Sequence, residues 1–123
     1  MIQITQLANK WNWRLRRSGK NWGKMPLPVA VTFPVSTEEV AIIAKICHKR
    51  RVPMIPYSGG SSVEGHFSAP FGGISVDFVN MNQILQVHAD DLNVVVQPSV
   101  PWMDLNEKIK DTGLFFPIDP GPS

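Results

Sequence analysis

Residues 29–56 constrain the fold most, because they read as a strand, a capped helix and a second strand. Val29–Phe33 is a short apolar run bracketed by prolines, which predicts a strand. Ser36 followed three residues later by Glu39 forms a capping box at a helix start. The VPMIP run at 52–56 predicts the second strand. Such a βαβ unit is expected to hold its two strands parallel, with a right-handed crossover.

The helix between these strands should pack on a sheet through a broad apolar face. The apolar residues that recur at helical spacing are Val40, Ile43, Ala44 and Cys47, and Ile42 and Ile46 widen the stripe. Cations at 48–51 end the helix, where the helix dipole favours positive charge. We therefore expect an α/β fold in which Cys47 is a buried small hydrophobe.

Beyond Gly73 the apolar residues alternate with a period of two. This pattern predicts three short strands, at 74–78, 83–88 and 93–97. A further helix is predicted between Pro101 and Gly113, with one apolar face formed by Trp102, Leu105 and Ile109.

The composition limits the class of protein. Hydrophobic residues make up 43% of the 123 residues and charged residues 18%, as expected for a soluble globular domain. The single Cys excludes an internal disulfide. No apolar run approaches the roughly 18 residues of a membrane-spanning helix, so we expect no transmembrane segment.

Charge is divided unevenly along the chain. Residues 1–25 hold six cations and no acid, whereas residues 26–123 hold the other six cations against all ten acids, a net charge of −4. The basic, Trp-containing leader at 1–25 could be a targeting presequence or a nucleic-acid arm, with Leu7, Trp11 and Leu15 on one side of a weak amphipathic helix. The alternative is a poorly ordered leader. The acidic remainder argues against nucleic acid as the main ligand.

The most informative segment is a glycine- and serine-rich loop, PYSGGSSVEGH, at 56–66. It follows the carboxyl end of a predicted strand, where open α/β sheets bind ligands. Glycines allow positive φ and close backbone approach, and successive amides in such a turn form an anion-binding nest. A pyrophosphate suits this loop, because amide and hydroxyl donors need no net positive charge.

Other phosphate-binding motifs fit this loop poorly. A Walker loop ends in Gly-Lys-Ser/Thr, and this loop has no Lys. The Rossmann fingerprint opens a helix, whereas this loop has a different glycine spacing and runs on to a predicted strand. A flexible Gly/Ser turn with no ligand remains the alternative.

An ordered set of segments resembles the FAD-binding domain of the vanillyl-alcohol oxidase/p-cresol methylhydroxylase (PCMH-type) group. The set consists of residues 28–66, then ISVDF, VVVQPSV and LFFPIDPGPS. Within that group the chain is most similar to the mitochondrial D-lactate dehydrogenases (cytochrome) of fungal type. The resemblance implies that residues 26–123 are the N-terminal part of such an FAD-binding domain, a βαβ unit followed by short strands and a helix, without its second half and the cap domain.

The resemblance also implies cofactor-binding residues. Those that would wrap the FAD pyrophosphate are Ser58, Gly59, Gly60, Ser61 and Ser62. Those that would flank it towards the ribityl chain and flavin are Pro56, Tyr57, Gly65 and His66. Pro98 and Ser99 match a Pro-Gly pair near the flavin, with Ser99 in place of the usual Gly. A second cofactor-binding stretch would begin at Pro120, Gly121, Pro122 and Ser123.

The acids and histidines give no catalytic or metal constellation. Some relatives tether flavin through a His, so His66 is a candidate, but the subgroup resembled holds FAD non-covalently. His48 and His88 stand at element ends and are expected on the surface. Glu64 could be a catalytic acid, although a structural role in the loop is the preferred interpretation. Three scattered His and one Cys lack the spacing of metal ligands.

The function implied is that of an FAD-dependent dehydrogenase of D-2-hydroxyacids. By resemblance it oxidises D-lactate to pyruvate by hydride transfer to FAD and passes electrons to cytochrome c in the mitochondrion. The catalytic residues would lie outside this chain, so the chain alone is expected to be inactive. The alternatives are a non-catalytic truncated fragment that lacks full FAD binding, and a related glycolate or D-2-hydroxyglutarate dehydrogenase.

Overall fold

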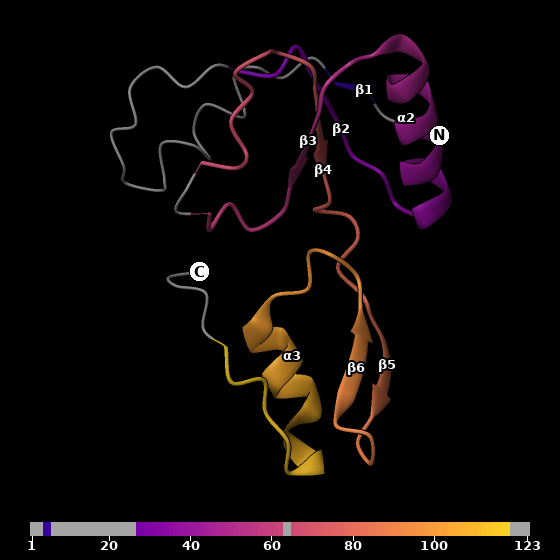
Figure 1. Cartoon of the computed structure of the whole chain (residues 1–123). Coiled ribbons are helices and arrows are strands. Elements are labelled where there is room, and N and C mark those ends of the chain that lie inside the picture. The colour runs from indigo at the N-terminus through magenta and orange to yellow at the C-terminus, as the bar shows by residue number, and fades with distance from the viewer. Residues whose placement is uncertain (1–3, 6–26, 63–64, 119–123) are drawn as a thin grey trace.

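The computed structural model describes residues 4–5, 27–62 and 65–118. Over these residues the chain forms a mixed α/β fold with two sheets (Figure 1). The larger sheet has four strands in the order β1-β2-β4-β3, and the smaller is a β5–β6 hairpin. This arrangement confirms the predicted fold class.

Parallel pairing organises the larger sheet. β2 (Ala30–Thr32) and β3 (Met54–Tyr57) both pair in parallel with β4 (Ile74–Asp77). The two strands of the predicted βαβ unit are therefore parallel, but β4 lies between them. β1 (Ile4–Thr5), which falls in the basic leader and was not predicted as a strand, pairs antiparallel with β2. The rest of the leader lies outside the described residues.

The central strand β4 is buried although two of its residues are polar. Ser75 is 0% exposed and Asp77 1% exposed, on a strand that pairs with β2 on one side and β3 on the other. The Ser75 hydroxyl donates to the Ile55 carbonyl at 3.3 Å, and the Asp77 carboxylate accepts from the Val79 amide at 3.0 Å. These hydrogen bonds offset the cost of burying polar groups.

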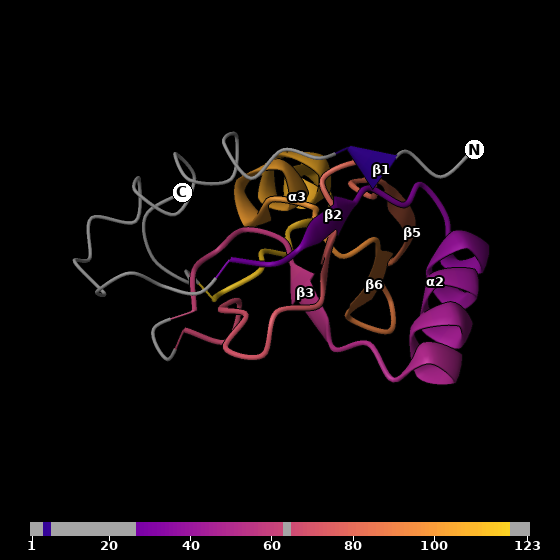
Figure 2. The ribbon, with the colours of Figure 1, turned by 90° about the horizontal axis from the view of Figure 1, so that it is seen from above.

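α2 (Thr37–Arg50) covers one side of the sheet, as both views show (Figures 1 and 2). Its N-cap is Ser36, whose hydroxyl accepts from the Glu39 amide at 3.2 Å, while the Glu39 carboxylate accepts from the Val35 amide at 3.1 Å. The predicted capping box is therefore present, with the glutamate reaching one residue further back than the Ser36 amide. Arg51, in the left-handed conformation, caps the other end.

The predicted apolar face of α2 is narrower than expected. Ile43 and Cys47 are buried and form a cluster with Val76 of β4. Ile42 and Ile46, by contrast, are 47% and 54% exposed, so the prediction that they widen the buried stripe is wrong. A helix can place only a limited arc of its circumference against a sheet, and these two side chains fall outside that arc.

The second half of the described chain forms a separate layer below the larger sheet in Figure 1. It consists of β5 (Ile84–His88), β6 (Asn93–Val96), α3 (Trp102–Ile109) and the 3₁₀ turn η1 (Lys110–Thr112), which ends at Gly113. All three predicted strands and the helix are confirmed, but β4 joins the parallel sheet rather than the hairpin. Within the described residues, no helix is long and apolar enough to cross a bilayer.

Candidate functional site: the loop after β3

The glycine-rich loop leaves the larger sheet at the carboxyl end of β3. There it borders a shallow hollow of about 200 Å³. The residues that line this hollow are Pro56, Tyr57, Ser58, Gly59, Gly60, Ser61, Ser62, His66 and Phe67. Eight of these nine were predicted cofactor-binding residues, so the structure brings most of the predicted first stretch together.

The aromatic rings of Tyr57 and Phe67 lie beneath the loop and form the floor on which it packs. Tyr57 is buried and meets Phe67 edge to face, with ring centroids 5.8 Å apart. Gly60 crosses this floor with φ of +66°, and a Cβ there would lie 2.7 Å from the Tyr57 hydroxyl oxygen. Only glycine combines that conformation with so close an approach. Phe67 was not among the predicted site residues, although an apolar side chain in a polar loop is a usable signal.

The loop presents a run of backbone donors. Among the described residues, the amides of Gly59, Gly60, Ser61 and Ser62 have no hydrogen-bond acceptor. The Ser62 hydroxyl accepts from the His66 amide at 3.3 Å and so holds the far side of the loop. Consecutive amides next to a left-handed glycine make an anion-binding concavity. This neutral donor set fits a pyrophosphate, whose oxygens can accept several N–H groups at once.

The second predicted segment lies against this loop. The Ser58 hydroxyl is 2.9 Å from the Pro98 carbonyl oxygen and 2.9 Å from the Ser99 hydroxyl oxygen. The Ser99 amide in turn donates to the Met81 carbonyl at 2.9 Å. The structure thus joins residues that are 40 positions apart in the sequence, a contact that no local sequence pattern could indicate.

The other residues considered in the sequence analysis make few contacts at the hollow or lie outside the described residues. Gly65 takes a positive φ of +69°, and His66 is exposed beside the hollow. His48 and His88 are exposed, as predicted. Glu64 and the second stretch, namely Pro120, Gly121, Pro122 and Ser123, lie outside the described residues.

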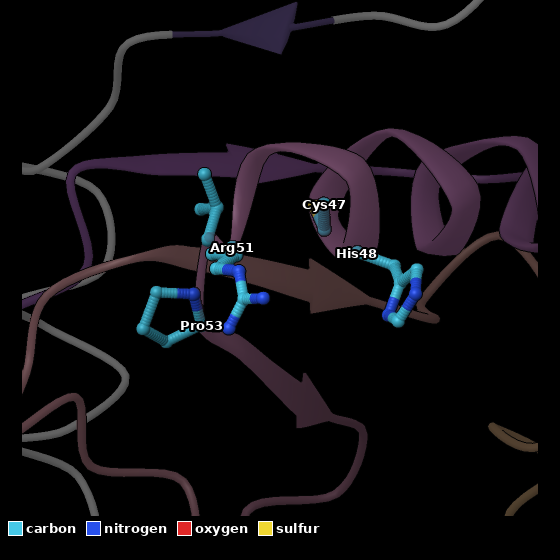
Figure 3. A pocket seen from close by; sticks show the side chains of 5 residues that line it. Cys47, His48, Arg51 and Pro53 are labelled. Carbon is cyan, nitrogen blue, oxygen red and sulfur yellow. The ribbon is translucent and has the colours of Figure 1, made fainter.

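A larger hollow lies at the opposite end of β3, where α2 ends and the chain turns into β3 (Figure 3). Its volume is about 430 Å³, and Cys47, His48, Arg51, Val52 and Pro53 line it. The amides of Arg51 and Val52 already donate to carbonyls of the last helical turn. The Arg51 side chain gives this hollow a positive charge, but its backbone donors are used, so among the described residues it lacks the run of free amides that the loop after β3 presents. The loop after β3 is therefore the better candidate site.

Comparison with known proteins identifies the class. The model of the FAD binding domain family matches residues 28–122. This chain therefore belongs to the FAD binding domain family, and FAD is the cofactor of that domain.

Comparison with curated proteins shows which members of the family the chain is similar to. The chain is 46% identical over 96 residues to a mitochondrial D-lactate dehydrogenase [cytochrome] of Arabidopsis thaliana and 48% identical over 98 residues to the corresponding Kluyveromyces lactis protein. These alignments take in 78% and 77% of this chain, which spans 17% of the length of each relative. More distant relatives include a glycolate oxidase subunit of Bacillus subtilis, 37% identical, and a D-2-hydroxyglutarate dehydrogenase of Stutzerimonas stutzeri, 35% identical.

A solved structure supports the fold. The crystal structure of p-cresol methylhydroxylase superposes with a TM-score of 0.61 over 71% of this chain and 17% of that chain, at 24% identity. At this identity the likeness shows the fold alone, which is the PCMH-type fold that the sequence resemblance implied.

Proposed function

We propose that this chain supplies the pyrophosphate-binding part of an FAD-dependent D-2-hydroxyacid dehydrogenase that acts on D-lactate. The observation that carries the proposal is the run of four amides at Gly59–Ser62 that have no acceptor within the described part of the chain, in a member of the FAD binding domain family. The similarity to mitochondrial D-lactate dehydrogenases [cytochrome] supports the substrate, a mitochondrial location and a cytochrome as electron acceptor, which in this proposal is cytochrome c.

The described residues have binding and positioning roles in this proposal. The four amides donate to the phosphate oxygens, and the exposed Ser61 hydroxyl adds a donor at the rim. Tyr57 and Phe67 support the loop from below and keep it in one conformation. When bound, FAD supplies the acceptor for the hydride of the substrate. No described residue is assigned as the base that takes the hydroxyl proton.

We further propose that FAD is held without a covalent bond to His66. The support for this proposal is that the subgroup which the sequence resembles holds FAD non-covalently; His66 itself is exposed beside the hollow. Precipitation of the FAD-loaded chain with acid should release the flavin into the supernatant. Flavin that stays with the precipitate would contradict non-covalent binding.

A second candidate is an FAD-dependent dehydrogenase of another D-2-hydroxyacid. The similarity to a glycolate oxidase subunit and to a D-2-hydroxyglutarate dehydrogenase favours it. These candidates differ in their substrate, and we assign no substrate contact to this chain. A substrate panel on a protein that carries the whole dehydrogenase would separate them.

Titration with FAD tests the proposal directly. We expect FAD fluorescence to be quenched saturably by the chain, and ADP to compete because it carries the same pyrophosphate. FMN, which has a single phosphate, should compete poorly. The absence of saturable quenching would overturn the proposal for this chain.

A second experiment concerns catalysis. We expect no D-lactate-dependent dye reduction by the 123 residues alone, and robust turnover would refute our assignment of catalysis to residues outside them.

A further inference from the structure

We propose that Ser99 is a positioning residue whose hydroxyl donates a hydrogen bond to Ser58, so that the cofactor loop is latched to the segment after β6. The inference rests on the proposed function for its consequence, FAD affinity, but the latch itself can be measured without FAD. We use the name Ser99 latch for the chain of contacts from Ser99 through Ser58 to Pro98.

Counting protons fixes the direction of the Ser99 latch. A serine hydroxyl has one hydrogen to donate, whereas a carbonyl oxygen can only accept. The Ser58 hydroxyl lies 2.9 Å from the Pro98 carbonyl oxygen, so its hydrogen is used there. The Ser58 and Ser99 hydroxyl oxygens are also 2.9 Å apart, and that contact must therefore use the hydrogen of Ser99.

The latch changes what Ser58 can do for a ligand. In this proposal its hydroxyl has no hydrogen left for a phosphate oxygen, so Ser58 would contribute to the pyrophosphate site by shaping the loop rather than by donating from its side chain. Ser99 has no free donor either, because its amide is bound to the Met81 carbonyl at 2.9 Å. Both serines therefore shape the loop, and the amides that follow Ser58 make the contacts.

Several backbone hydrogen bonds hold the anchor of the latch. Met81 is buried, and the Ser99 amide ties residue 99 to it. Two further backbone hydrogen bonds hold the same turn: the Gln97 amide donates to the Gln83 carbonyl, and the Val100 amide donates to the Gln97 carbonyl. Ser58 is thereby attached to the hairpin layer as well as to β3. Fixing the first residue of the loop in two directions reduces the conformational freedom that FAD binding would otherwise remove.

A double-mutant cycle tests the latch. The variants are Ser58→Ala, Ser99→Ala and the double variant, with FAD affinity and denaturant unfolding as the two readouts. Loss of one neutral hydrogen bond should weaken FAD binding about fivefold in Ser99→Ala. Ser58→Ala removes both bonds and should weaken binding more. Adding Ser99→Ala to Ser58→Ala should then change nothing further, because the acceptor is already gone.

Two further variants keep the test decisive. Ser99→Thr retains the hydroxyl and should bind FAD as the unmodified chain does. Ser68→Ala, just beyond the hollow and in a hydroxyl that has no partner among the described residues, is the matched control for losing one serine. Additive effects of Ser58→Ala and Ser99→Ala, on the free energy of unfolding or on FAD affinity, would overturn the latch.

The latch and the proposed function can fail separately. If the unmodified chain does not bind FAD, the proposed function fails, while the coupling between the two substitutions in the free energy of unfolding still decides the latch. If Ser58→Ala does not fold, the comparison of Ser99→Ala with Ser99→Thr decides the test. Stability to unfolding that is lost in Ser99→Ala and equally lost in Ser99→Thr would overturn the latch.

Discussion

At the scale of single residues, the shape of the cofactor loop depends on where glycine is required and where it is not. Gly60 passes over Tyr57 with a positive φ and almost no room for a side chain, whereas a Cβ at Gly59 would meet nothing within 4 Å. The sequence indicated a phosphate-binding loop but not which of its neighbouring glycines is constrained. That information comes from the tyrosine beneath, which belongs to the preceding strand.

The contrast gives a first prediction. Gly60→Ala should lower the free energy of unfolding by about 1–2 kcal/mol, because alanine is strained at this φ and its methyl group would push on the Tyr57 ring. FAD affinity should fall about tenfold as the amides are displaced, since about 1.4 kcal/mol corresponds to that factor. Denaturant unfolding and fluorescence titration measure the two effects. Gly59→Ala is the control, and an equal loss in both variants would contradict the account.

At the scale of elements, the strands and helices follow from the sequence but their arrangement does not. The alternating pattern predicted a strand at ISVDF, and the structure makes it the central strand, between β2 and β3, with the polar Ser75 and Asp77 buried. Which strand becomes central depends on long-range pairing that local periodicity does not encode. The exposed Ile42 and Ile46 of α2 show the same limit, since a wide apolar stripe does not say which arc meets the sheet.

Gly73, the residue before β4, gives a prediction about how β4 fits beside the chain that leads into β3. Its φ is +94°, and a Cβ there would overlap the Pro53 carbonyl, which accepts the Ile74 amide. Gly73→Ala should therefore cost about 3 kcal/mol, from strain at positive φ together with overpacking. Gly113→Ala, at φ of +74° in open space, should cost only about 1 kcal/mol for the strain. Thermal or denaturant unfolding of the two variants makes the comparison, and similar losses would refute the role of Gly73.

The N-terminus of α2 gives a pH prediction. The backbone amide of Glu38, and then the Ser36 hydroxyl, hold the pKa of the Glu38 carboxyl below its ordinary value. A pKa that is lower in the folded state contributes stability above the unfolded value, and this is lost as the pH falls through the folded value. Ser36→Ala should raise the Glu38 pKa towards its ordinary value and cost about 1 kcal/mol as a lost N-cap.

Carboxyl titration by NMR measures the first of these effects and denaturant unfolding the second. Glu38→Gln is the control, because it should remove this acid-dependent part of the stability while leaving Ser36 in place as the cap. A Glu38 pKa that does not move in Ser36→Ala would contradict the proposed hydrogen bond.

At the scale of the whole molecule, the candidate site is where two layers meet. The loop after β3 belongs to the parallel sheet, and Pro98 and Ser99 belong to the turn between β6 and α3. The sequence resemblance predicted both segments as cofactor-binding, whereas their hydrogen-bonded contact emerges only from the fold. Large apolar side chains stay exposed on the second layer, among them Leu85, Val95, Phe115 and Ile118.

The central claim, that the loop amides hold the FAD pyrophosphate, is tested most directly by amide NMR spectra of the chain during titration with FAD. The account predicts saturable shifts centred on Gly59–Ser62, reproduced by ADP and largely absent with FMN. Shifts centred on the hollow at Cys47–Pro53, or no saturable shift in the loop, would contradict it.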